Sequence, residues 1–169
     1  LAIQSIWERQ FRVYLKLYAC EFCQDTGVAE KIVHARWPEL CQLFHDLRGI
    51  SLEKFPSFPE LDTLCHLGNA CRHGDGPSVK KLADRCPEWW RMPSAAALAS
   101  ETDSVFQSNP TISTMIVPME RIKGFADAIV RFWEDVNHIN NESCERKSAS
   151  FLRDINRGRI DRCWLLDTD

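Results

Sequence analysis

The sequence predicts an all-α fold, a single bundle of about five helices. Apolar side chains recur at steps of three and four over residues 2–23 and again over residues 118–138. Positions with this spacing share one face of an α-helix, so each segment is expected to bury that face in a core. A strand is indicated only at residues 111–117, where it would have no partner strand. At 169 residues the chain fits one domain of common size.

The composition is that of an ordinary globular protein. Hydrophobic residues make up 44% and charged residues 27% of the chain, which argues against gross disorder. The net charge of -3 argues against a protein that coats nucleic acid irrespective of sequence, although a local basic patch could still bind a phosphate. Leu1 opens directly into a helical pattern, so no signal peptide is predicted, and the chain could be part of a longer protein. No run of 18 apolar residues exists, so we expect a cytoplasmic protein without a membrane partner.

Eight cysteines raise the alternatives of a disulfide scaffold and a metal site. Disulfide-rich domains are small and rich in loops, whereas these cysteines lie in Leu-rich helical patterns. Cys20 and Cys23 form a C-x-x-C without a second pair, which a closed zinc site needs. The residues that could add ligands, if the fold placed them nearby, are Cys65, His66, Cys71 and His73. We expect buried reduced thiols, with no metal and no cofactor.

The first third of the chain is expected to hold two long helices. An aromatic seam over residues 2–23, interpreted as core, consists of Ile3, Trp7, Phe11, Tyr14, Tyr18 and Phe22. Asp25 or Thr26 can cap a second helix, which Pro38 restarts or kinks. Gly49 suits the C-cap of that helix, and His45 beside its apolar face is interpreted as structural or exposed.

Signals for turns and helix ends divide the rest of the chain. After a connector at residues 50–58, Ser57 and Pro59 begin a helix that Gly74 ends, and Pro77 begins another. Trp89 and Trp90 are expected to lock the end of that helix against the core. Residues 91–109 carry no clear pattern, 111–117 are the short strand, 118–138 are a helix and 145–156 a weak helix. We therefore divide the chain into a helical domain, residues 1–138, and a loosely ordered tail, residues 139–169.

The candidate site is the stretch of residues 61–76, in which a polar stripe runs into a glycine-bounded turn. The stripe consists of Asp62, His66, Asn69 and His73, spaced 4, 3 and 4 apart, with Arg72 beside it. The neighbouring stripe that could face a core consists of Leu61, Leu64, Cys65, Gly68 and Cys71. The polar side chains could converge on an anion or a phosphodiester, or form an ordinary solvated or core-facing polar face. Beyond Gly76, a helix N-terminus with Lys80 and Lys81 nearby could hold an anion.

Three segments carry a resemblance to known proteins. LRGISLEKFPSF, LCHLGNACRHGDGPSVKKL and FADAIVRFWEDV together resemble bacterial proteins of unassigned function with an N-A-x-[KR]-H-G-D-G turn. Those proteins are in turn similar to outlying members of the HEPN superfamily (higher eukaryote and prokaryote nucleotide-binding). The resemblance covers about residues 3–138. It implies a helical bundle that often dimerises, and in many members a metal-independent ribonuclease of toxin, abortive-infection or other phage-defence systems.

The usual motif of that superfamily is an arginine and a polar residue, with a histidine after four to six intervening positions. Here Arg72 and His73 are adjacent, so the spacing is absent. Arg131 and His138 do have six intervening residues and would share a helix face, but Phe132 stands where the superfamily prefers a polar residue. About one such pair is expected by chance, so the stretch at residues 61–76 ranks first.

If the chain is a ribonuclease, each residue type has a role. His73 would be the general acid or base, Arg72 the phosphate clamp, Asn69 an orienting group and His66 a second proton carrier. The substrate or phosphate would lie against Arg72, Gly74, Asp75, Gly76 and Lys80. Two copies meeting at a dimer axis could combine their stripes in one cleft, with RNA or a nucleotide as ligand.

Two further functions stay open. A non-catalytic helical module could serve as the regulatory or antitoxin-like partner of an operon-encoded protein, and the compressed Arg72-His73 spacing favours it. Alternatively, residues 74–77 and the next helix could form a nucleotide-binding sensor. A homodimer is expected from the resemblance and from the six Trp and nine Phe, which exceed the apparent need of one core.

Overall fold

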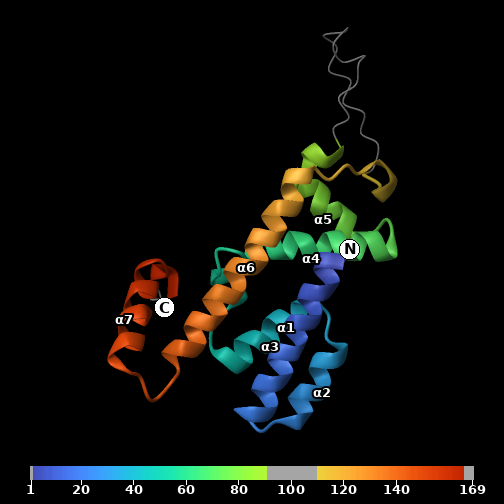
Figure 1. Ribbon diagram of the computed structural model, residues 1–169. Helices are drawn as coiled ribbons and strands as arrows, with labels where there is room; N and C mark the ends of the chain where they lie inside the picture. Colours follow the sequence, from blue (N-terminus) through green and yellow to red (C-terminus); the bar gives the residue numbers. More distant parts are fainter. Residues whose placement is uncertain (1, 91–109, 166–169) are drawn as a thin grey trace.

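The computed structural model describes residues 2–90 and 110–165, which fold into seven α-helices without a β-strand (Figure 1). The helices are α1 (Ala2–Glu21), α2 (Thr26–His34), α3 (Trp37–Arg48), α4 (Phe58–His73), α5 (Pro77–Arg85), α6 (Met119–Glu142) and α7 (Ala149–Ile160). The all-α fold class is thus confirmed, with seven helices where about five were expected. None of the helices in the described ranges is both long and apolar enough to cross a membrane.

Local chemistry fixes several helix ends at the positions that the sequence indicates. The Asp25 carboxylate accepts a hydrogen bond of 2.9 Å from the backbone N–H of Val28 and so caps α2. Pro38 lies in the first turn of α3, so it begins a new helix rather than kinking a longer one. Gly49 and Gly74 end α3 and α4 with φ of 68° and 73°, which side chains with a Cβ rarely adopt.

Aromatic rings form the larger of two apolar clusters. It lies between α1, α3, α4 and α6, and Phe132 of α6 contacts four rings from α1, α3 and the connector before α4. The smaller cluster joins α4, α5 and α6 through Leu64, Leu82 and Phe125, with Trp89 packed among them. Trp89 is fully buried at the end of α5, as expected, while Trp90 is half-buried. Much of the aromatic content therefore fills the core of a single chain. The homodimer stays a prediction, but it is not needed to explain the number of aromatic residues.

The aromatic seam of α1 is buried along only part of its length. Trp7 and Phe11 lie in the core, Tyr14 and Tyr18 are half-buried, and Phe22 is 72% exposed. The interpretation of the whole seam as core was therefore wrong at its C-terminal end. There the last turns of α1 lie beside Arg48 and Asn140, at the ends of α3 and α6, with no further apolar layer to cover them. Ile122 in the apolar pattern of α6 is likewise exposed.

Residues 111–117 do not form the predicted strand. Ile112–Thr114 is one turn of 3-10 helix, and the chain around it bonds to the 3-10 turn Pro87–Trp90, which follows α5, instead of to a second strand. The Ile116 N–H donates to the Trp89 carbonyl at 2.7 Å, and the Trp90 indole N–H donates to the Thr111 carbonyl at 2.8 Å. β-Branched composition favours a strand only where a partner is available. Residues 91–109, for which no regular structure was predicted, lie outside the described ranges.

The predicted helix at residues 145–156 forms as α7, residues 149–160, and packs on the C-terminal half of α6 (Figure 1). Ion pairs join the two helices and the turn after α7. Arg162 Nε lies 2.6 Å from Asp135 Oδ1, and Arg159 Nε lies 2.5 Å from Glu142 Oε1. A Cβ at Gly158 would lie 2.7 Å from the His138 ring, so this glycine permits the close contact.

All eight cysteines are free, but they are not the buried set that was expected. Cys65 and Cys86 are buried and Cys41 is half-buried, while the other five are exposed. Of the exposed cysteines, Cys20 and Cys71 fall on the outer faces of α1 and α4, while Cys23, Cys144 and Cys163 lie in the turns that follow α1, α6 and α7. Burial raises the pKa of the Cys41 thiol to about 12, so this group stays protonated at neutral pH.

Candidate functional site

The first half of the polar stripe, Asp62 and His66, is buried in a network between α3, α4 and α5. Asp62 Oδ1 accepts a hydrogen bond of 2.6 Å from the Trp37 indole N–H, and Asp62 Oδ2 lies 2.5 Å from Arg85 Nη1. His66 Nε2 is 3.7 Å from the same carboxylate oxygen, and its Nδ1 is 3.5 Å from the Ser78 hydroxyl. Burial lowers the pKa of His66, and the charges of Lys81 and Arg85 lower it further against the opposing effect of Asp62. The network joins α3, α4 and α5, with the Asp62 and His66 side chains largely buried among them.

The second half of the stripe turns toward α1. Arg72 donates from Nη1 to Gln4 Oε1 at 3.0 Å and from Nη2 to Asn69 Oδ1 at 3.3 Å, and its Nη2 lies 3.8 Å from Glu8 Oε2. Gln4 is 1% exposed and lies against Gly68, where a Cβ would be 2.7 Å from the Gln4 side chain. Arg72 and Asn69 are therefore engaged in joining α4 to α1.

His73 and the turn after it lie apart from both groups. His73 is exposed and makes no hydrogen bond or ion pair with another residue of the described chain. In the turn, Asp75 Oδ1 accepts a hydrogen bond of 2.6 Å from the Ile112 N–H, so this carboxylate fastens the start of the segment that leads into α6. Lys80 is exposed on α5 beyond Gly76. Cys71, predicted to face the core with Gly68, is exposed, so that part of the stripe prediction was wrong.

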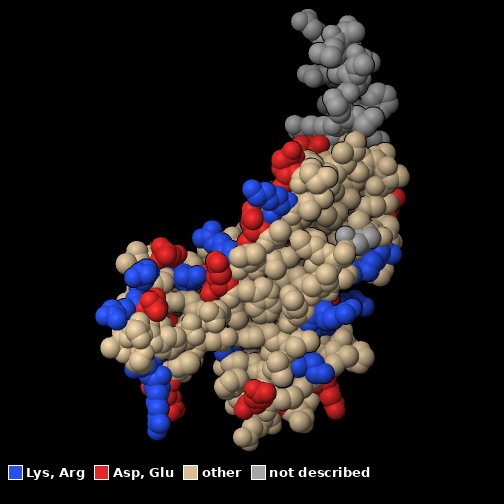
Figure 2. Space-filling model, viewed as in Figure 1, with Lys and Arg blue, Asp and Glu red and all other residues tan. Residues whose placement is uncertain are grey.

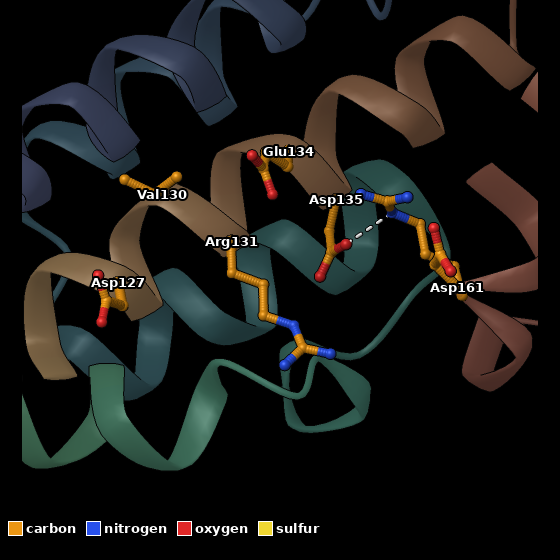
Figure 3. Close-up of a pocket in the computed structure, with 7 residues that line it drawn as sticks. Asp127, Val130, Arg131, Glu134, Asp135 and Asp161 are labelled. Carbon is orange, nitrogen blue, oxygen red and sulfur yellow. Dashed lines mark hydrogen bonds and ion pairs between the residues drawn. The ribbon is translucent and has the colours of Figure 1, made fainter. Parts of the chain in front are cut away.

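Arg131 and His138, the second candidate pair, occupy different environments on α6. Arg131 lines an open cavity of about 380 Å³ whose other charged residues are Asp127, Glu134, Asp135, Asp161 and Arg162 (Figure 3). Its side chain extends away from α6, and the Asp135 carboxylate pairs with Arg162 instead (Figure 3). His138 is buried against α7, outside the residues that line this cavity, with Nε2 3.4 Å from Glu142 Oε1. The pair therefore does not open onto one shared cavity.

The charges visible on the surface are mixed in sign. Figure 2 shows Lys and Arg side chains interspersed with Asp and Glu around α7 and along the edges of the view, with a broad uncharged band over the middle. This face offers no continuous basic track for a nucleic-acid backbone. Within residues 2–90 and 110–165, no three His, Cys, Asp or Glu side chains are grouped as a metal ion would require.

Comparisons of the chain with protein-family models, with curated proteins and with solved structures find no match.

Several partners of the polar stripe could not be predicted from the sequence. Trp37, Arg85 and Ser78 lie on α3 and α5, far along the chain from Asp62, and Gln4 lies on α1. Spacing along one helix predicts which side chains share a face, but not which neighbouring helix covers it. The one available signal was polar Gln4 within the apolar pattern of the first helix.

The two buried histidines make stability dependent on pH. Burial is the largest cause that lowers the pKa of His66 and of His138, and Arg162 adds to it at His138. The unfolded chain, with histidine pKa values of about 6.5, therefore binds protons more readily than the folded chain. The contribution of each histidine is fully present above about pH 7.5 and is lost as the pH falls through its lowered folded pKa. We expect the melting temperature to decrease as the pH is lowered from about 7.5 to about 5.5.

Single replacements identify the groups responsible. His66→Gln and His138→Gln should each reduce the slope of melting temperature against pH. The charged and polar groups that face the His66 ring are Asp62, Ser78, Lys81 and Arg85. Those that face the His138 ring are Glu142, Arg159, Arg162 and Asp135. His45→Gln is the matched control, since His45 is exposed on α3. Equal slopes in the wild type and both buried-histidine variants would contradict the prediction.

Proposed function

We propose that this chain is a non-catalytic helical module of the HEPN-like class, a regulatory or partner subunit in a bacterial defence or toxin–antitoxin system. One observation carries the proposal: two of the side chains expected to form a ribonuclease site are engaged in contacts that join helices. Arg72 is bound to Gln4 and His66 lies between Asp62 and Ser78, while His73 is exposed and contacts neither group through a hydrogen bond or ion pair. A general acid or base and a phosphate clamp must reach one reacting phosphate together.

The HEPN-like assignment is supported by the all-helical fold and by the order of the three resembling segments. The turn after α4 has a structural use here, because Gly74 takes a positive φ and Asp75 binds the Ile112 N–H. A turn of this kind can position helices for a partner without performing chemistry. The setting in a defence or toxin–antitoxin system rests on the resemblance, with an operon-encoded protein as the expected partner.

The function test compares Arg72→Ala with His73→Ala. We expect the wild-type chain to leave RNA intact in buffer containing a chelator. Arg72→Ala should lower the free energy of unfolding by about 1–2 kcal/mol, because it leaves the buried Gln4 oxygen with only a long hydrogen bond of 3.5 Å from the Ser5 hydroxyl. His73→Ala should change it by less than about 0.5 kcal/mol, since the side chain is exposed. Denaturant titration followed by circular dichroism measures both, with Lys80→Ala as an exposed control.

A binding experiment tests whether the chain associates with a partner protein. The chain co-expressed with the product of the adjacent gene in its operon should co-elute with that product in size-exclusion chromatography. Metal-independent cleavage by the wild type that His73→Ala abolishes would overturn the non-catalytic assignment. Failure to co-elute would remove the partner part of the proposal.

A ribonuclease is the second candidate, and it is favoured by the imidazole of His73, which is exposed and has no partner among residues 2–90 and 110–165. That ring is free to meet a substrate or a second copy of the chain, in which case the homodimer would be essential. Arg72→Lys would then impair cleavage, because an ammonium cannot reproduce the planar fork of a guanidinium. The same RNA assay separates the two candidates.

A further inference from the structure

Few apolar contacts hold residues 143–165, the C-terminal strap, against the rest of the chain. The strap comprises the turn after α6, then α7 and the turn that follows it, and it lies beside the C-terminal half of α6 (Figure 1). Among these residues only Ile155 is buried, while Trp164 and Leu165 are half-buried against the larger apolar cluster. Trp164 packs on the Phe55 ring with centroids 4.8 Å apart. Apolar burial therefore anchors the strap less firmly than it anchors α6, whose core residues include Phe125, Phe132 and Val136.

The face of α6 beneath the strap is polar. Four residues at steps of four, three and four share one side of this helix, namely Arg131, Asp135, His138 and Glu142. The strap meets the last three of them through Gly158, Arg159 and Arg162. A polar stripe at helical spacing is typical of a surface that water can cover. The open cavity of about 380 Å³, lined by α6 and by the turn after α7, lies at the edge of this contact (Figure 3).

Three polar atoms at this contact are buried without a hydrogen-bond partner among the described residues. They are Asp135 Oδ2, Trp164 Nε1 and His138 Nε2, the last of which is near Glu142 without being hydrogen-bonded to it. Release of the strap would expose these atoms to water, which can bond to them. The buried pair of Asp135 and Arg162 also carries a desolvation cost that opposes the attraction between its charges. The docked position of the strap is thus opposed at several points by groups that water would satisfy.

We propose that the C-terminal strap releases from α6 as a unit while the rest of the bundle stays folded, and that protonation of His138 promotes this release. The charges that face the His138 ring are divided between the two sides of the contact. Both cations, Arg159 and Arg162, belong to the strap, whereas both anions, Glu142 and Asp135, belong to α6. A positive charge on the ring therefore repels the strap, but it remains attracted to the carboxylates of its own helix.

Lowering the pH favours the released state through His138. In the docked state burial lowers the pKa of this ring, and Arg162 and Arg159 lower it further. A hydrated histidine has a pKa of about 6.5, so the released state binds protons more readily and gains population as the pH falls through that value. Burial raises the pKa of Asp135 against the opposing charge of Arg162, so this carboxyl acts in the opposite direction. The two effects separate when His138 is replaced.

Hydrogen exchange of the full chain tests the proposal, followed by mass spectrometry at pH 7.5 and 5.5 and corrected for intrinsic exchange rates. A released helix of 12 residues is marginal in water, so α7 loses its amide protection when the strap opens. We expect α7 to exchange at least about tenfold faster than residues 125–136 of α6, because a local opening needs less free energy than global unfolding. Between pH 7.5 and 5.5 the protection of α7 should fall further, by up to about tenfold.

Two variants with matched controls identify the groups responsible. His138→Gln should abolish the fall in protection, and any remaining pH dependence, from Asp135, should have the opposite sign. His45→Gln, on the exposed side of α3, should leave the fall unchanged. Arg162→Gln should speed the exchange of α7 at both pH values without changing that of α4, because it removes the ion pair to Asp135. Arg157→Gln is its control, since Arg157 is exposed on α7.

The proposal is overturned if α7 and residues 125–136 exchange at the same corrected rate, since the strap would then open only with the whole fold. It is also overturned if the protection of α7 does not change between the two pH values, or if it falls equally in His138→Gln. Equal acceleration of α4 and α7 by Arg162→Gln would have the same consequence. Neither RNA nor a partner protein takes part, so failure here is distinguishable from failure of the proposed function.

Discussion

Replacement of Phe132 by alanine is expected to lower the free energy of unfolding by about 3–5 kcal/mol, a large share of the stability of a single domain. The ring of Phe132 is fully buried, and α6 places it at the centre of the larger apolar cluster. Its centroid lies within 6.4 Å of the ring centroids of Trp133, Phe55, Phe11, Trp7 and Phe44. Removing the ring leaves a cavity that five rigid neighbours cannot close.

Urea titration followed by far-ultraviolet circular dichroism measures this loss. Ile122→Ala is the control on the same helix, because Ile122 is 45% exposed and its truncation leaves no enclosed cavity. Phe132→Leu should fall between alanine and the wild type, since it refills part of the volume. A Phe132→Ala variant as stable as Ile122→Ala would show that the aromatic cluster does not hold these helices together.

Asp62→Ala is expected to cost about 3 kcal/mol, even though the sequence presents Asp62 as the first member of a polar stripe. The substitution leaves the buried Trp37 indole N–H without an acceptor and separates Arg85 of α5 from its carboxylate. Much of the cost should come from Trp37, because Arg85 is partly exposed and water can hydrate its guanidinium.

A double-mutant cycle tests that division. In a Trp37→Phe background, Asp62→Ala should cost clearly less, because no buried N–H remains to be orphaned. Asp84→Ala on α5 is the control, since Asp84 is exposed and has no partner among the described residues. If Asp62→Ala left stability unchanged, the network would not join α3, α4 and α5, and Asp62 would again be a candidate for chemistry.

The fold class was predictable because helical periodicity is a local property. Trp7, Phe11, Phe125 and Phe132 recur with the period of a helix, and each of them is buried. Capping chemistry is equally local, so Asp25 begins α2 and Gly49 ends α3 where the sequence indicated. The prediction of a strand at residues 111–117 was wrong because a strand needs a partner strand, and the presence of a partner is not a local property.

The candidate site was less predictable, because its character depends on contacts between distant segments. The spacing of Asp62 and His66 placed them on one face, but Trp37 and Arg85 determine that this face is enclosed. The exposed end of the aromatic seam was missed for the same reason. Phe22 continues the period of Trp7 and Phe11, yet the helices that cover those two residues end before they reach it.

The contacts around Trp89 and Trp90 set the point from which α6 starts. Thr111 and Ile116 are hydrogen-bonded to these two tryptophans, and Asp75 binds Ile112. The segment before α6 is thus tied both to the turn after α4 and to the turn after α5. The direction in which α6 leaves this corner of the molecule is therefore determined before its first helical residue, Met119.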